Sequence, residues 1–283
     1  MPERDAPGAP PSDRTLSLIG AVGWTCLVVL LFALILSLSA SFRPGLSQEL
    51  VNLQVCYSLA LSLGTWLLVR VHLPTRDVLD VIGARSVPWW LVLAGLGVGV
   101  LLQLPAQWVD GLVTRRWPLS PEEQERQAAL FVFKSTGHKA AFLFAATLLG
   151  PTVEEIFCRG ALFRVLRRSY RALPTVLITT GSFAFLHQEP RYALNAALCG
   201  LVLGVLRLWA GSTWVSLAAH TAFNAVTTIA LLGGWVRLGE PQEPLPLVWG
   251  LLGTAALAGG LVGIRAATLR SPLALTACEE DTK

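Results

Sequence analysis

Long apolar segments recur along this chain, and they constrain its fold more than any other feature. The first runs from Leu16 to Phe42, about 27 residues, whereas about 20 are enough for a helix to cross a bilayer core. The whole chain is 53% hydrophobic and only 14% charged, with a mean hydropathy of +0.58, which is too apolar for a soluble domain. The sequence therefore predicts an all-α, polytopic membrane protein.

Turn residues and charges divide the apolar sequence into eight predicted transmembrane helices. The first is longer than a signal-peptide core of roughly 7–15 residues, so we expect it to be retained, while the small residues from Ser37 to Ser41 leave a cleaved signal as the alternative. The fourth begins near Lys139 and continues past two glutamates into an arginine-rich end. We expect a disordered tail at 1–14, a single transmembrane domain at 15–265 and a polar tail at 266–283. The other seven helices are predicted at about 16–42, 51–69, 89–108, 174–187, 192–209, 213–232 and 246–264.

The polar segment 110–139 separates the third and fourth predicted spans. In it, Ser120 is followed three residues later by Glu123, the pattern of a capping box at a helix start. We therefore expect an amphipathic helix at the membrane interface, running to about Phe133.

Charged and sulfur-containing residues narrow the partners and the location. The net charge of +4 comes with no phosphate-binding loop, zinc-finger spacing or long basic tract, so no nucleic-acid partner is predicted. The five cysteines form no paired spacing, and we expect no disulfide scaffold. With the N-terminus inside, fourteen Lys and Arg fall on the inner side against eight outside, which favours a cytoplasmic N-terminus. The excess of 19 arginines over 3 lysines hints at a GC-rich genome, and hence at a bacterial inner membrane.

Two adjacent acids, Glu154 and Glu155, follow the apolar run at 140–149. Charges inside a bilayer cost roughly 2.5–3.5 kcal/mol each on insertion scales. Glu155 and Arg159 are four residues apart and can pair on one helical face, whereas Glu154 is rotated by about 100° and has no such helical partner. Alternatively, both acids lie at a helix end near Pro151, where the helix dipole stabilises negative charge.

Two of the four histidines fall within or at the end of predicted spans. His187 follows Phe183 by one turn, and His220 precedes Asn224 by one turn, so each pair shares a helical face. A lone histidine in a membrane helix is more often a helix–helix contact than a catalyst. Three polar motifs together in one region, 140–232, are less easily explained that way.

These motifs resemble the CPBP family of intramembrane proteases, which includes the type II CAAX prenyl endopeptidases. The family pattern Glu-Glu-x-x-x-Arg, Phe-x-x-x-His and His-x-x-x-Asn/Asp is matched in order, with Cys158 standing where Phe often precedes Arg-Gly. The resemblance implies an active site between helices four, five and seven, without a metal or other cofactor, that cleaves a membrane-associated protein or peptide. Lipidated proteins and proteins with a C-terminal sorting signal are two substrate classes that the resemblance leaves open; the oligomeric state is not indicated. The matching residues are Glu154, Glu155, Arg159, Phe183, His187, His220 and Asn224.

Roles for these residues also follow from the resemblance. Glu154 and His187 would activate water, a role that suits a buried carboxylate. His220 and Asn224 would hold the oxyanion, and Glu155 with Arg159 would orient the helix. In a layout of straight helices, Glu154 and His187 lie at similar depth, but His220 lies about two turns deeper than His187, on the order of 10 Å.

Several other readings of the same residues stay open at this stage. A zinc peptidase would use the Glu and His side chains as ligands, although no HExxH helix is present. A cysteine protease would need Cys158 to act with His187. A proton-coupled transporter also keeps buried acids and histidines, and a catalytically silent scaffold or immunity protein would tolerate the loss of Glu154.

Overall fold

The computed structural model describes residues 14–236 and 245–269, and in these ranges the chain is helical, without strands. The helices, including one 3-10 segment (η1) and two π segments (η2 and η3), are α1 (Leu18–Phe42), η1 (Pro44–Gln48), α2 (Leu50–His72), α3 (Val78–Val81), α4 (Trp89–Leu101), α5 (Gln103–Arg116), α6 (Pro121–Leu130), α7 (Thr136–Phe144), η2 (Ala145–Leu149), α8 (Gly150–Glu155), η3 (Ile156–Leu162), α9 (Phe163–Arg167), α10 (Ala172–Leu186), α11 (Pro190–Ala210), α12 (Thr213–Leu232) and α13 (Leu247–Leu269).

The predicted set of spans is confirmed. Seven helical stretches are long and apolar enough to cross a membrane, and α10 is a shorter apolar helix, which gives eight. The seventh, α12, has the limits predicted for it. The last, α13, continues to Leu269 and so passes the predicted end at residue 265. The predicted tails, apart from Arg14 and the end of α13, lie outside the described residues. This chain is an integral membrane protein.

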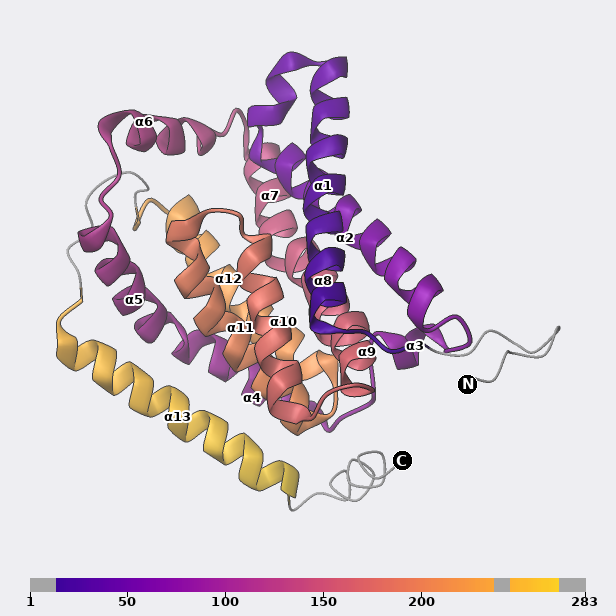
Figure 1. The fold of residues 1–283 in the computed structure, drawn as a ribbon. Helices are drawn as coiled ribbons and strands as arrows, with labels where there is room; N and C mark the ends of the chain where they lie inside the picture. The colour runs from indigo at the N-terminus through magenta and orange to yellow at the C-terminus, as the bar shows by residue number, and fades with distance from the viewer. Residues whose placement is uncertain (1–13, 237–244, 270–283) are drawn as a thin grey trace.

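One continuous helical rod carries the two adjacent acids. It extends over Thr136–Arg167 and contains α8 between the two π segments η2 and η3. Such wide turns are rare and often occur at functional sites. In Figure 1 the rod passes through the middle of the molecule, beside α2, α10 and α12, while α13 lies outside α4 and α5.

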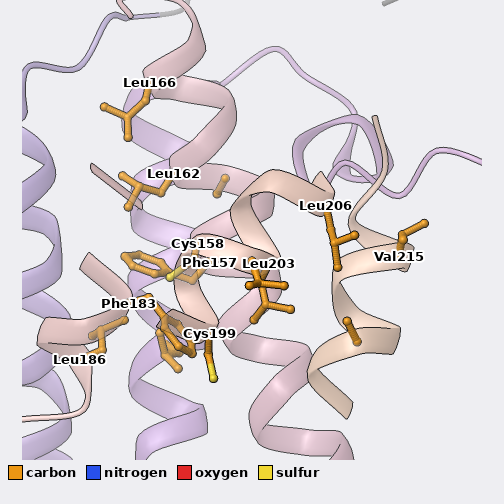
Figure 2. Packing of buried hydrophobic residues seen from close by; sticks show 14 of the residues in the cluster. Phe157, Cys158, Leu162, Leu166, Phe183, Leu186, Cys199, Leu203, Leu206 and Val215 are labelled. Carbon is orange, nitrogen blue, oxygen red and sulfur yellow. The ribbon is translucent and has the colours of Figure 1, made fainter. Parts of the chain in front are cut away.

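Apolar packing joins the rod to α10 and α11. Figure 2 shows Phe157 and Cys158 of η3 gathered with Phe183 of α10 and Leu203 of α11. Each of these four side chains is at most 1% exposed. Close packing of this kind fixes the rotation of each helix about its axis, and so fixes which side chains face the interior.

Segments at one end of the bundle hold the N-terminal residues in place. The Arg14 backbone N–H donates to the His72 carbonyl over 2.9 Å, and the Leu18 backbone N–H donates to the Tyr170 hydroxyl over 2.9 Å. The residues before α1 therefore lie on the same side as the arginine-rich end of the rod. The count of Lys and Arg also places these two parts of the chain on one side of the membrane. That this side is the cytoplasmic one stays a prediction.

The predicted capping box is present at the start of α6. Ser120 Oγ accepts from the Glu123 backbone N–H over 3.3 Å, and a Glu123 carboxylate oxygen accepts from the Ser120 N–H over 2.8 Å. Arg191, at the start of α11, donates to the same carboxylate over 3.1 Å. The Ser120 backbone N–H and then Arg191 lower the pKa of Glu123 from its usual value. The helix ends at Leu130, before the predicted Phe133.

Candidate active site

The predicted ion pair forms at the centre of the bundle. Arg159 Nη1 lies 2.8 Å from Glu155 Oε1, and both side chains are 0% exposed. Arg159 Nη2 also donates to the Gly200 carbonyl over 2.9 Å, and the guanidinium carbon lies 4.6 Å from the centre of the Phe183 ring. Of these three contacts, the one with Gly200 ties α11 to the rod and the one with Phe183 ties α10 to it. Replacing Arg159 with lysine would lose the forked hydrogen bonding that a guanidinium allows.

Glu154 has a partner in a distant helix, which the sequence did not reveal. Its side chain is buried, and one carboxylate oxygen lies 3.4 Å from His220 Nε2. The reading of Glu154 as the freer acid is therefore correct only within its own helix. Helical spacing predicts only the partners that lie on the same helix, whereas His220 belongs to α12.

His220 lies between the two adjacent carboxylates. Its Nδ1 is 3.2 Å from Glu155 Oε1, and its Nε2 faces Glu154. Because the Glu155 carboxylate pairs with Arg159, its oxygen accepts, and Nδ1 is therefore the donor. A proton on either Nε2 or the Glu154 carboxyl is then needed to bridge the second contact. The imidazole is 4% exposed, so this proton is shielded from bulk water.

Phe183 connects the two histidines. Its ring centre lies 4.8 Å from that of His187 and 5.5 Å from that of His220, in edge-on geometry in both cases. The straight-helix estimate placed the histidines about 10 Å apart in depth. That estimate overlooked Phe183, which lies one turn deeper in α10 than His187 and bridges the difference.

His187 ends α10 with a defined tautomer. Its Nδ1 lies 2.9 Å from the Phe183 carbonyl oxygen, which can only accept, so Nδ1 carries the hydrogen and Nε2 keeps a lone pair. The residue is exposed, in contrast to His220. Among the described residues His187 forms no ion pair with Glu154, and the two meet only through Phe183 and His220.

Asn224 joins the site through the first π segment. Its Nδ2 donates to the Ala146 carbonyl over 3.0 Å, one turn before α8 begins. An amide nitrogen carries two hydrogens, so one remains for another acceptor. His220 and Asn224 share a face of α12, as their spacing predicted, and this face is turned toward the rod.

Two further groups near the site went unnoticed in the sequence. The Tyr57 side chain of α2 interacts electrostatically with Glu154, and Gln103, at the start of α5, donates to the Phe223 carbonyl over 2.6 Å. A polar residue in the middle of an apolar span is itself a signal, since an unbonded amide there is costly. Gln103 carried that signal.

The arrangement of the acidic, histidine and cysteine side chains does not favour a zinc peptidase or a cysteine protease. No group of three or more His, Cys, Asp and Glu in the described ranges is arranged to hold a metal ion. Cys158 is 0% exposed and packs in the apolar cluster of Figure 2, where a thiol is inert rather than reactive.

Fold and site together define a class: an integral membrane protein with a buried Glu–His cluster inside a helical bundle. The comparison with protein families makes this more specific. Residues 136–226 match the family model described as type II CAAX prenyl endopeptidase Rce1-like, which confirms the resemblance of the three motifs. Searches of curated proteins and of solved structures found no match to this chain. Over these residues, which carry all three motifs, the chain is similar to the CAAX-type intramembrane proteases.

Proposed function

We propose that this protein is an intramembrane endopeptidase that uses water activated by Glu154 and His187, with His220 and Asn224 as oxyanion donors. The observation that carries the proposal is the contact of His220 with both adjacent carboxylates. A structural histidine needs one partner, whereas two acids around one imidazole form a proton-handling group in a dry site. The substrate we propose is a membrane-associated protein or peptide, lipidated or bearing a C-terminal sorting signal.

The first step is attack on the scissile carbonyl carbon. A water oxygen forms the new C–O bond while its proton moves to the Glu154 carboxylate or to His187 Nε2, which has a free lone pair. The C=O electrons move onto the oxygen. His220 Nε2–H and the second Nδ2–H of Asn224 would stabilise this oxyanion.

The second step breaks the peptide bond. The oxyanion reforms the carbonyl, the C–N bond breaks, and the departing amine takes the proton held by Glu154 or His187. Glu155 supports both steps indirectly, because its contact with His220 Nδ1 holds the ring with Nε2 directed at the site. The contact with Arg159 Nη1 holds the Glu155 carboxylate in position.

The test is hydrolysis of membrane-tethered reporter peptides, prenylated and unprenylated, by the full chain in proteoliposomes. Glu154→Gln should abolish cleavage and leave expression and thermal stability near those of the parent. Glu125→Gln is the matched control, since Glu125 is an exposed acid of α6 outside the bundle interior, and it should cleave like the parent. Cleavage by Glu154→Gln at the parent rate would refute the role assigned to Glu154. Absence of cleavage by the folded parent chain would instead favour a scaffold or transporter.

A further inference from the structure

The third span, formed by α4 and α5, approaches α12 closely along a line of three residues, Gly95, Gly99 and Gln103, each one turn after the last. An ideal Cβ at Gly95 would lie 2.5 Å from the Val215 carbonyl oxygen. One placed at Gly99 would overlap the Ala219 carbonyl oxygen. Real side chains do not come so near, so both positions require glycine. Small residues four apart allow such backbone contact between membrane helices.

Gln103 continues this line into α5. Its Nε2 donates to the Phe223 carbonyl over 2.6 Å, and its Oε1 accepts from the Thr227 hydroxyl over 3.3 Å. The side chain is 8% exposed. Pro105 explains the break between α4 and α5, since it has no N–H to donate to the Leu101 carbonyl. The break falls at Leu102, and Gln103 follows it directly.

The pairing is in register, which makes it informative. Gly95, Gly99 and Gln103 meet Val215, Ala219 and Phe223 in turn. We call these six residues the seam. Each step is four residues on both helices, so α4–α5 and α12 run parallel through three successive turns.

The seam residues of α12 immediately precede the site residues. His220 follows Ala219, and Asn224 follows Phe223. One residue corresponds to a rotation of about 100°. With Ala219 and Phe223 held against α4 and α5, His220 and Asn224 are turned toward α8 and η2, where their partners Glu154 and the Ala146 carbonyl lie.

We infer that Gly99 and Gln103 are positioning residues, which set the depth and rotation of the His220–Asn224 pair for the reaction. This inference rests on the proposed protease function. The contact made by Gln103 is to a backbone carbonyl between the two site residues, so its loss frees that turn of α12 without removing any group from the site. A side chain at Gly99 would instead push the whole turn outward.

The test compares kcat, KM and thermal stability of full-length variants on a cleaved reporter. Gln103→Met keeps the length but removes the hydrogen bonds, and should lower kcat about tenfold, the factor that one typical hydrogen bond contributes. KM should change little, and the melting temperature should fall by only a few degrees. Gly99→Ala should lower kcat about 10²-fold, the scale of a 1 Å misplacement. Gly97→Ala is the matched control on the same helix, because nothing lies within 4 Å of its added methyl group. It should retain the parent kcat.

Gln103→Glu adds a readout that a merely structural role would not move. A carboxyl group can donate to the Phe223 carbonyl only when protonated, so the ratio of its kcat to that of the parent should rise as the pH is lowered. Parent-level kcat in Gln103→Met and Gly99→Ala, alongside an inactive Glu154→Gln, would overturn the seam inference alone. Full activity of Glu154→Gln would instead refute the proposed function. If Gly99→Ala does not fold, Gln103→Met and Gln103→Glu decide the question.

Discussion

Removing Glu155 should destabilise this protein because it strands a charge in the bundle interior. Arg159 is 0% exposed, and in Glu155→Leu it would keep only the Gly200 carbonyl and the Phe183 ring as partners. Breaking a buried ion pair by removing one partner costs about 3–5 kcal/mol. At about 2–4 °C per kcal/mol for a domain of 150–250 residues, the melting temperature should fall by roughly 6–20 °C.

The double variant Glu155→Leu/Arg159→Met separates the stranded charge from simple loss of packing. Replacing a whole buried pair with apolar residues is often neutral or stabilising. Here the pair is also incompletely satisfied, since Arg159 Nε makes no hydrogen bond among the described residues. The double variant should therefore melt within a few degrees of the parent, above Glu155→Leu. Its activity should stay low, because His220 Nδ1 has lost its acceptor.

Thermal melts in detergent, followed by the fluorescence of the ten tryptophans, would measure both effects. The cycle needs Glu155→Leu, Arg159→Met and the double variant under identical conditions. The reasoning fails if Glu155→Leu melts at the parent temperature. It fails equally if the double variant is no more stable than Glu155→Leu, because the loss would then come from packing rather than from an unpaired charge.

Three further predictions concern the oxyanion site, the metal and the interfacial helix. Asn224→Ala should lower kcat about 10²–10³-fold with a much smaller change in KM, and an unchanged kcat per folded molecule would exclude its role as an oxyanion donor. Activity should survive extended chelation without stoichiometric zinc in the purified protein; zinc-restored activity would indicate a metallopeptidase built on Glu154, His187 and His220. The pKa of Glu123 is lower in the folded protein than its usual value. The stability that its cap gives to α6 is therefore fully present at a pH above the usual glutamate pKa, and it is lost as the pH falls through the lowered pKa. The protection of the α6 amides against hydrogen exchange, corrected for the intrinsic pH dependence of the exchange rate, should then fall on acidification, an effect that Glu123→Gln should lack.

Local physics made the helices and the chemical residues readable from the sequence. The limits of α12 were predictable because Gly211 adopts a left-handed conformation and Ser212 caps the new helix, and both signals lie within a few residues of the helix start. The Glu155–Arg159 pair was predictable for the same reason, since helical spacing alone brings those side chains together. The seven candidate site residues came from the resemblance of the three motifs to a family, and their roles stay predictions.

Only the tertiary structure decided which of these residues meet. Glu155 and His220 are 65 residues apart, and their contact depends on the rotation and depth of two helices that no local pattern specifies. The same holds for Phe183, which contacts both histidines, and for the π turns on either side of α8. The length of an apolar segment indicates that it crosses the membrane. A helix that is apolar on most of its faces carries no pattern that fixes its rotation, so its rotation is set by packing. In this protein that packing is the close approach of Gly95 and Gly99 to α12 and the bond from Gln103 to the Phe223 carbonyl.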